Sequence, residues 1–246
     1  TMPAHIETNL ENGVFTLSIN RPDKMNALNA AMYGAMADAL NGAASNPEIN
    51  VIVIRGGDNF TAGYDLTDLL ENPPEGESSP VFRFMFALSE CPLPVIAIID
   101  GAAVGIGVTL LLHCDFVYAT PEAEFLMPFV NLGAVPEFGA SQILPLRAGY
   151  LKAAELLMFA DKFDSNTALD AGIITSIHGR DELESVVADC IRKLASKSRA
   201  SIVSTKALLK RDIEPLSDRI RAEAAIFTSG IASPEAQGIL KAFLKR

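Results

Sequence analysis

The order of hydrophobic and polar positions predicts an α/β core followed by a helical tail. Residues 14–20 alternate apolar and polar side chains, which predicts a half-buried strand. Residues 51–55 and 95–100 are short, continuous apolar runs, as expected of strands that are covered on both faces. The segments 115–120 and 124–128 predict two further short strands.

Helical patterns occupy most of the remaining chain. The segments that predict separate helices are 29–44, 81–91 and 108–114, the last after a glycine-rich turn over 101–107. Asn29 is placed to cap the first of them. From about residue 149 the pattern is helical and broken only at 172–177. Strands that alternate with crossover helices predict an α/β fold, with a core over residues 1–195 and a helical C-terminal region over 196–246.

Composition and charge argue against nucleic acid and membranes as binding partners of the protein. The 246 residues are 49% hydrophobic and 20% charged, and the formal net charge is −10. This acidity argues against nucleic acid or an anionic membrane surface as a partner. Gly, Pro or charged residues interrupt every apolar stretch before it reaches membrane-spanning length, and we find no signal peptide. We therefore expect a soluble, cytoplasmic protein with no membrane partner.

Cysteine and histidine spacing predicts neither disulfides nor a metal site. The three cysteines are odd in number and widely spaced, at positions 91, 114 and 190, as expected of free thiols in a reducing compartment. The three histidines are equally scattered, at positions 5, 113 and 178. The segment 71–80, "ENPPEGESSP", has a composition typical of a mobile surface loop.

Two glycine-rich turns, "TAGYDL" (61–66) and "AAVGIGV" (102–108), follow expected strands and lead into expected helices. Glycine lets backbone approach a ligand closely, and amides at a helix start have free N–H groups. Two such turns could converge on one oxygen atom and form an oxyanion hole. Ordinary strand-to-helix turning is the alternative. The second turn lacks the third glycine of a dinucleotide-binding fingerprint, and we find no phosphate-binding loop or nucleophile elbow.

Five segments occur in an order that identifies a family resemblance. They are "RPDKMNALN", "FTAGYDL", "IDGAAVGIGVTLLLHCDFVYAT", "FLMPFVNLGAVPEFGAS" and "SPEAQGILKAFLKR". Together they resemble the crotonase superfamily, the enoyl-CoA hydratases and isomerases, over nearly the whole chain. The resemblance implies a crotonase-like spiral of ββα units, a helical C-terminal trimerisation region, and acyl-CoA thioester substrates of fatty acid metabolism. Coenzyme A is then part of the substrate, so no separate cofactor is expected.

The resemblance also assigns individual residues. The backbone N–H groups of Tyr64 and Ile106 match the two oxyanion amides of the family. The positions that match its coenzyme-binding strip are Lys24, Ala27, Leu28, Ala62, Asp65 and Leu66. Phe243 and Arg246 match positions that reach the coenzyme of a neighbouring subunit in relatives. Asp65 could instead brace its own loop through side-chain to backbone hydrogen bonds.

Assembly into a homotrimer or a dimer of trimers is expected on two grounds. One is the resemblance. The other is the segment 224–244, which carries more apolar residues than one small domain could readily bury alone.

Both carboxylates of the hydratases in this family are missing. Their positions, carried over by resemblance, hold Thr109 and Phe129. Threonine is not a base near neutral pH, and phenylalanine has no proton to exchange. Direct hydration by the usual mechanism is therefore not expected.

Glu137 stands alone among small and apolar residues in "NLGAVPEFGAS". This segment resembles the corresponding one in isomerases that convert 3-enoyl-CoA to 2-enoyl-CoA, where a single catalytic carboxylate follows a proline. An apolar environment would raise the pKa of Glu137 towards the working range of a proton shuttle. A helix-start charge that interacts with the helix dipole is the alternative for this residue. For the whole chain, the alternatives are a hydratase or other crotonase-type lyase, and a non-catalytic acyl-CoA-binding scaffold.

Overall fold

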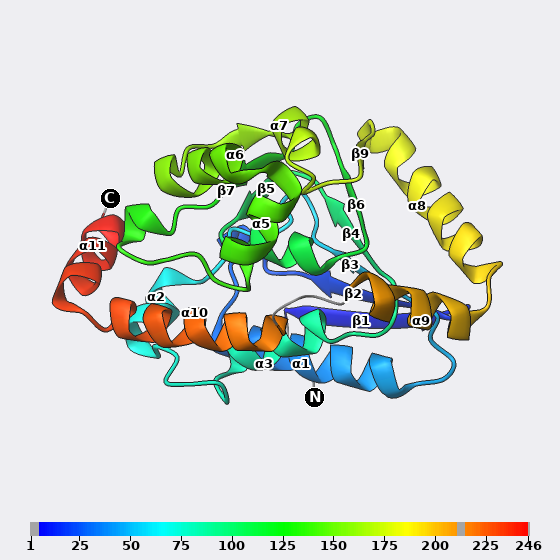
Figure 1. Ribbon diagram of the computed structural model, residues 1–246, viewed down its shortest axis with the longest axis horizontal. Coiled ribbons are helices and arrows are strands. Elements are labelled where there is room, and N and C mark those ends of the chain that lie inside the picture. The colour runs from blue at the N-terminus through cyan, green and yellow to red at the C-terminus, as the bar shows by residue number, and fades with distance from the viewer. Residues whose placement is uncertain (1–4, 211–214, 246) are drawn as a thin grey trace.

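Two β-sheets organise the computed structural model, which describes residues 5–210 and 215–245 (Figure 1). The larger sheet has the strand order β1-β2-β3-β4-β6-β9, with β1 Ile6–Glu11, β2 Val14–Ile19, β3 Val51–Arg55, β4 Val95–Ile99, β6 Phe116–Ala119 and β9 Ser176–Ile177. The smaller sheet has the order β5-β7-β8, with β5 Ala102–Val104, β7 Glu124–Leu126 and β8 Phe163–Asp164. The helices are α1 Ala30–Ser45, α2 Leu66–Glu71, α3 Pro80–Ser89, α4 Ile106–Thr109, α5 Ala140–Ala148, α6 Tyr150–Ala154, α7 Ser165–Asp170, α8 Arg180–Ala195, α9 Arg199–Leu209, α10 Leu216–Ile231 and α11 Pro234–Leu244. The expected α/β class is confirmed.

The strands of the larger sheet run parallel except for β1, which pairs with β2 as an antiparallel hairpin. The hairpin turns at Asn12 and Gly13, both with positive φ angles, as a tight two-residue turn requires. The sequence pattern did not predict β1, because most of its side chains are not buried and leave little apolar alternation.

Both faces of β3 and β4 are covered, as their apolar runs predict. Ile52 and Ile54 belong to the main core with α1 and α3, whereas Val51 and Val53 belong to a second core against α8. Asn29 accepts a hydrogen bond from the Met32 N–H and caps α1, as expected. Each large aliphatic side chain that is buried in this way contributes about 1.5–3 kcal/mol to folding.

The segments that follow successive strands of the larger sheet lie beside one another and are joined by backbone hydrogen bonds. The Thr61 N–H donates to the Ala102 carbonyl oxygen at 3.0 Å, and the Val104 N–H donates to the Thr61 carbonyl oxygen at 3.0 Å. In the next turn, the Gly105 N–H donates to the Leu126 carbonyl oxygen at 2.8 Å. This arrangement is the repetition of strand–strand–helix units that the resemblance implies, and it aligns loops that are far apart in sequence.

Three expectations for local structure were wrong. The turn over 101–107 contains β5, which pairs with β7. The helix over 108–114 is instead α4 followed by a 3-10 helix, Leu110–His113, whose tighter turn lets the Cys114 N–H donate to the Leu111 carbonyl oxygen. The pattern from residue 149 was expected to be helical except at 172–177, but this part of the chain also contains β8, Phe163–Asp164, which pairs with β7. The expected break itself contains β9, an edge strand of two residues.

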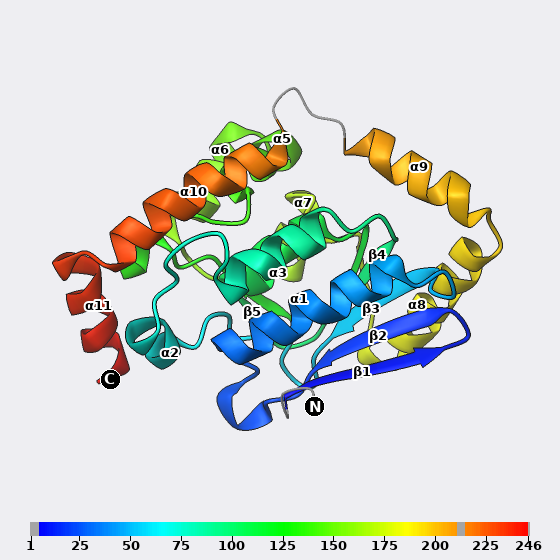
Figure 2. The same ribbon diagram turned by 90° about the horizontal axis from the view of Figure 1, so that it is seen from below.

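The C-terminal helices pack on their own chain. In Figures 1 and 2, α10 lies along one side of the molecule and α11 lies beside α2, and residues of α2 and α11 are in contact. The apolar residues that these two helices bury include Ile220, Phe227, Ile231 and Leu240. The expected division at residue 195 coincides with the end of α8, and the separate function of the C-terminal region stays a prediction.

The segment between α2 and α3 covers most of the expected mobile loop 71–80. The Ser79 hydroxyl accepts hydrogen bonds from the N–H groups of Glu75 and Gly76, and Glu77 pairs with Arg221 of α10 at 2.9 Å. The mobility of this loop stays a prediction. Among the helices of the described residues, none combines the length and the apolar character needed to cross a membrane.

Candidate active site

The two glycine-rich turns lie directly against each other. A Cβ atom on Gly63 would lie 2.4 Å from the Val104 carbonyl oxygen, and Gly63 has a φ angle of +84°. Gly105, in the facing turn, has a φ angle of +57°. A larger residue at position 63 would therefore push the two turns apart, in addition to adopting an unfavourable left-handed conformation.

Tyr64 and Ile106 follow these two glycines. Within the described part of the chain, neither backbone N–H donates a hydrogen bond to another protein group. Tyr64 is bridged to Leu28, but the hydrogen bonds of that bridge use the Leu28 N–H and the Asp65 N–H instead. Ile106 is the first residue of α4, where N–H groups have no partner within the helix. The neighbouring turns thus present two N–H groups that are available to a ligand oxygen.

Glu137 is buried, with 4% of its surface exposed. The Thr109 hydroxyl donates a hydrogen bond to Glu137 Oε1 at 2.6 Å, whereas Glu137 Oε2 is buried with no hydrogen-bond partner. Burial raises the pKa of Glu137 to about 8; the negative charge of Glu223 adds to the rise, and the hydrogen bond from Thr109 opposes it. Glu137 precedes α5 and is not part of its first turn, so the geometry does not favour a simple helix-start charge.

The turn after Glu137 is strained and held from two sides. Phe138 and Gly139 have φ angles of 61° and 72°, and the left-handed conformation is unfavourable for phenylalanine. Burial lowers the pKa of His113 to about 3, so its imidazole is neutral. The ring stacks on Phe138 at a centroid distance of 4.0 Å, and Nε2–H donates to the Phe138 carbonyl oxygen at 2.6 Å.

Glu223 of α10 also binds this turn. It follows the turn in sequence, whereas His113 precedes it. The Glu223 carboxylate is buried and accepts hydrogen bonds from the Gly139 N–H at 2.6 Å and from the Ser141 hydroxyl at 2.5 Å. Sequence reasoning missed both supports. Glu223 lies in a helical tail without a motif, and His113 was considered only as a metal ligand. Its position in the sequence, directly before "CD" at a helix end, gave no signal of this contact.

A row of aromatic rings connects the turn of Tyr64 to the Glu137 turn. The ring centroids of Tyr64 and Tyr33 are 5.0 Å apart, those of Tyr33 and Phe84 are 5.8 Å apart, and those of Phe84 and Phe138 are 5.9 Å apart. Tyr33 belongs to α1 and Phe84 to α3, two helices that pack along each other (Figure 2). This side of the candidate site is therefore mainly aromatic.

Neither position that the resemblance assigns to a hydratase carboxylate carries a carboxylate, and both side chains are buried. Thr109 is fully buried and uses its hydroxyl on Glu137, and Phe129 is also buried. Thr109 thus has a function that the sequence did not predict: it binds the one oxygen of Glu137 that has a partner.

The residues of the expected coenzyme strip lie together around the bridge between Leu28 and Tyr64. The Ala62 N–H donates to the Met25 carbonyl oxygen at 2.9 Å, which brings residues 24–28 against 62–66. Lys24 is exposed, Leu28 is fully buried, and Ala27, Ala62 and Leu66 are half-buried. Asp65 accepts hydrogen bonds from the N–H groups of Thr67 and Asp68, so the bracing function proposed for it as an alternative is present.

An ion pair fixes this strip further. Arg21 pairs with Asp65 at 2.7 Å and also donates to the Ala27 carbonyl oxygen at 3.1 Å. Phe243 lies on α11 with 56% of its surface exposed, outside this group of residues. Arg246, which was expected to reach a neighbouring coenzyme, lies outside the described residues.

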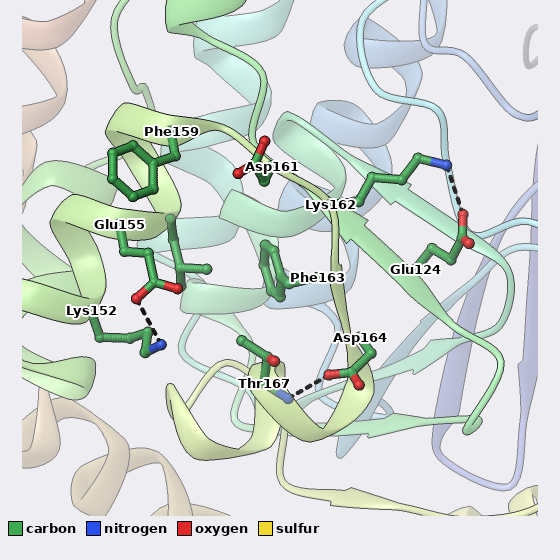
Figure 3. A pocket seen from close by; sticks show the side chains of 10 residues that line it. Glu124, Lys152, Glu155, Phe159, Asp161, Lys162, Phe163, Asp164 and Thr167 are labelled. Atoms are coloured by element: carbon green, nitrogen blue, oxygen red, sulfur yellow. Dashed lines mark hydrogen bonds and ion pairs between the residues drawn. The ribbon is translucent and has the colours of Figure 1, made fainter.

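A separate surface hollow of about 480 Å³ lies between β7, β8 and α6–α7 (Figure 3). Charged side chains line much of it, including the ion pairs Lys152–Glu155 at 2.9 Å and Lys162–Glu124 at 3.0 Å. None of its lining residues belongs to the site built around Glu137.

The fold and these two glycine turns define an acyl-CoA enzyme, and the comparison with known families agrees. The chain belongs to the enoyl-CoA hydratase/isomerase family, whose model matches residues 9–246 and whose members act on acyl-CoA thioesters. The crotonase-like fold is confirmed by a solved structure of Pseudomonas aeruginosa OdaA. That protein is 44% identical to this chain, covers 99% of it and 100% of its own length, and superposes with a TM-score of 0.95.

Two of the relatives whose names specify a reaction are isomerases. The peroxisomal Delta(3,5)-Delta(2,4)-dienoyl-CoA isomerase of Arabidopsis thaliana is 34% identical over 85% of this chain and 81% of its own length. Enoyl-CoA delta isomerase 2 of Homo sapiens is 31% identical over 96% of this chain. The present chain spans only 62% of the length of the human protein.

Proposed function

We propose that the protein is an isomerase that moves the double bond of a 3-enoyl-CoA to the 2-position. In this mechanism, the Glu137 carboxylate removes a proton from C2 of the thioester. The electron pair delocalises into a dienolate, whose oxygen accepts hydrogen bonds from the Tyr64 and Ile106 N–H groups. Protonated Glu137 then returns the proton to C4, which leaves the double bond conjugated with the thioester and the carboxylate regenerated.

One observation carries the proposal: Glu137 is a buried carboxylate with an unpartnered oxygen and a pKa raised to about 8. A group that must first accept and then donate the same proton works best with a pKa close to the ambient pH. Keeping such a group in an apolar environment is unfavourable for folding, so a non-catalytic scaffold would have no reason to retain it. The names of two relatives, a dienoyl-CoA isomerase and an enoyl-CoA delta isomerase, support the movement of a double bond in an acyl-CoA thioester.

Hydration is disfavoured by the residues at the two water-binding positions. The Thr109 hydroxyl donates a hydrogen bond to Glu137, and the Phe129 side chain contains only carbon and hydrogen. We therefore expect hydration of a 2-enoyl-CoA to be orders of magnitude slower than isomerisation, because no second group positions the water. Hydration and isomerisation at similar rates would contradict this exclusion.

The remaining functional assignments are part of the same proposal. Lys24, Ala27, Leu28, Ala62, Asp65 and Leu66 would bind the coenzyme A portion of the substrate, because they form one continuous strip beside Tyr64. A cytoplasmic location stays a prediction, and the Arabidopsis relative is named as peroxisomal.

The test of the reaction is Glu137→Gln. This change retains size and hydrogen-bonding capacity but removes the base, so we expect kcat for isomerisation of 3-hexenoyl-CoA to fall about a hundredfold to ten-thousandfold. Such a loss corresponds to roughly 3–5 kcal/mol of barrier. The measurement is growth of the conjugated product, together with a binding titration in which affinity for the thioester should change little.

Glu122→Gln is the matched control, since Glu122 is an exposed carboxylate in a turn before β7. It should retain the wild-type rate. Exchange of the C2 protons with deuterated solvent should occur in the wild type and disappear in Glu137→Gln. If Glu137→Gln retained most of the rate and the exchange, the proton shuttle would be excluded.

A further inference from the structure

The Tyr33 hydroxyl is an unusual group in this site. Tyr33 lies in α1 with none of its surface exposed, and its hydroxyl oxygen has no hydrogen-bond partner. In the described part of the chain, only two other buried side-chain atoms share this property, Glu137 Oε2 and Gln142 Oε1. A buried hydroxyl without a partner destabilises a protein, so each such group requires an explanation.

Its surroundings place the Tyr33 ring beside the proposed substrate site. The Tyr33 ring contacts the ring of Tyr64, whose backbone N–H is one of the two proposed oxyanion donors. On its other side it contacts Phe84, which leads through Phe138 to the Glu137 turn. Tyr33 is thus in the middle of the aromatic row between the two ends of the proposed reaction centre.

The hydroxyl can act as a donor at any physiological pH. Burial raises the pKa of Tyr33 well above its ordinary value. The neighbouring groups that raise it further are Tyr64, Glu137, Asp68 and Asp65. A phenol whose pKa is raised keeps its proton at physiological pH, so Tyr33 offers a neutral O–H that needs an acceptor.

Packing alone does not account for this hydroxyl. The same row uses phenylalanine at positions 84 and 138, and a phenylalanine at position 33 would provide the same ring contacts without a buried orphan oxygen. A site that contains a buried hydrogen-bonding group discriminates against ligands that leave the group unpaired. The missing acceptor is therefore expected on the ligand.

We propose that the Tyr33 hydroxyl donates a hydrogen bond to an oxygen atom on the acyl chain, so that the site selects acyl-CoA thioesters with a hydroxyl or carbonyl substituent over plain hydrocarbon chains. This inference depends on the proposed function only in placing the acyl group along the aromatic row. It names a class of substrate and a residue that determines specificity.

Binding of saturated thioesters tests the inference without any turnover. Calorimetric titration would compare hexanoyl-CoA with its 4-, 5- and 6-hydroxy analogues, on the wild type and on Tyr33→Phe. We expect at least one hydroxy analogue to bind the wild type about tenfold more tightly than hexanoyl-CoA. Tyr33→Phe should lose this preference and bind hexanoyl-CoA at least as well as the wild type does.

Tyr118→Phe is the control, because Tyr118 packs against α8 on the other face of the sheet. It should retain the preference. Equal affinity of the wild type for all four thioesters, or a preference that persists in Tyr33→Phe, would overturn the inference and indicate that water satisfies the hydroxyl. Isomerisation of 3-hexenoyl-CoA is measured in parallel: activity without a binding preference contradicts only this inference, and a preference without activity contradicts only the proposed function.

Discussion

At the scale of single residues, the ionisation of Glu137 results from opposing effects on one carboxylate. Burial raises its pKa, the negative charge of Glu223 raises it further, and the Thr109 hydroxyl lowers it by stabilising the ionised form. Because the resulting pKa is about 8, most of the free enzyme has a protonated Glu137 at neutral pH. The proposed isomerisation begins with the ionised form, so kcat/KM should rise with pH and level off above this value.

Thr109→Val removes the hydroxyl that binds Glu137 Oε1 and retains the shape of the side chain. The ionised form of Glu137 then loses its stabilising hydrogen bond, so its pKa should rise by about one unit. We expect the rising limb of the pH profile of kcat/KM to move to higher pH by a similar amount. The measurement is the rate of 3-enoyl-CoA isomerisation from pH 6 to about pH 10 in wild type and variant.

Thr205→Val serves as the control, since Thr205 is exposed on α9 and bonds only the carbonyl oxygen of Ser201 in its own helix. Its pH profile should coincide with that of the wild type. A Thr109→Val profile that is unchanged, or displaced to lower pH, would show that the threonine does not stabilise the carboxylate.

At the scale of elements, α10 supports the candidate active site although it lies far from Glu137 in sequence. Glu223 accepts hydrogen bonds from Gly139 and Ser141, while His113 binds the Phe138 carbonyl oxygen from the end of the 3-10 helix. The two residues after Glu137 have positive φ angles, and such a turn persists only when its surroundings hold it. The orientation of the carboxylate therefore depends on the packing of the C-terminal helices.

Glu223→Ala should lower kcat by about tenfold to a hundredfold, because the turn loses both hydrogen bonds and the carboxylate moves relative to the substrate. Thioester affinity should change much less, since these two hydrogen bonds hold the turn after Glu137 and not the proposed coenzyme-binding residues or the turns of Tyr64 and Ile106. Ser141→Ala removes only one of the two bonds and leaves the charge in place, so its loss of rate should be smaller.

Glu223→Gln provides a readout that a purely structural change would not affect. It removes the negative charge that raises the pKa of Glu137, so the rising limb of kcat/KM should move to lower pH, opposite to Thr109→Val. The other titratable groups beside Glu137 are Tyr33 and Tyr64, which stay neutral over this range, and His113, which is neutral above about pH 3. Full activity and an unshifted profile in both Glu223 variants would exclude this function of α10.

Local sequence patterns predicted the elements in which each residue reports its own environment. The alternation in β2, the apolar runs of β3 and β4, and the Asn29 cap are consequences of burial or of one nearby hydrogen bond. β1 and β5 escaped prediction because an exposed edge and a glycine-rich turn carry no periodic apolar signal. Glu137 was identifiable because its apolar neighbours are adjacent in sequence. Glu223 and Tyr33 were not, because their significance comes from contacts with residues that are distant in sequence.

At the scale of the whole molecule, the tail supports the expectation of an oligomer only in part. The chain itself buries Ile220, Phe227, Ile231 and Leu240 of α10 and α11, whereas Phe243 and Leu244 at the end of α11 are exposed. A different surface remains apolar: the α5–α6 face, which we define as Leu146, Tyr150, Leu151, Met158 and Phe159, each between 63% and 83% exposed. Phe159 also lines the hollow of Figure 3, so the two features share one side of the molecule.

Large apolar side chains that are exposed next to one another usually mark a contact surface, because water disfavours such a patch. We therefore expect the α5–α6 face to form the subunit contacts of a homotrimer or a dimer of trimers. Leu151→Glu should convert the assembly to monomers, since an 83%-exposed leucine in the free chain would become a buried charge in the interface. Leu209→Glu introduces the same charge at an 81%-exposed leucine of α9, outside this face, and should leave the assembly intact.

Size-exclusion chromatography with light scattering gives the mass of the assembly in the wild type and in each variant. A monomeric wild type at micromolar concentration, or assemblies that withstand Leu151→Glu but not Leu209→Glu, would show that the subunits do not meet through this face.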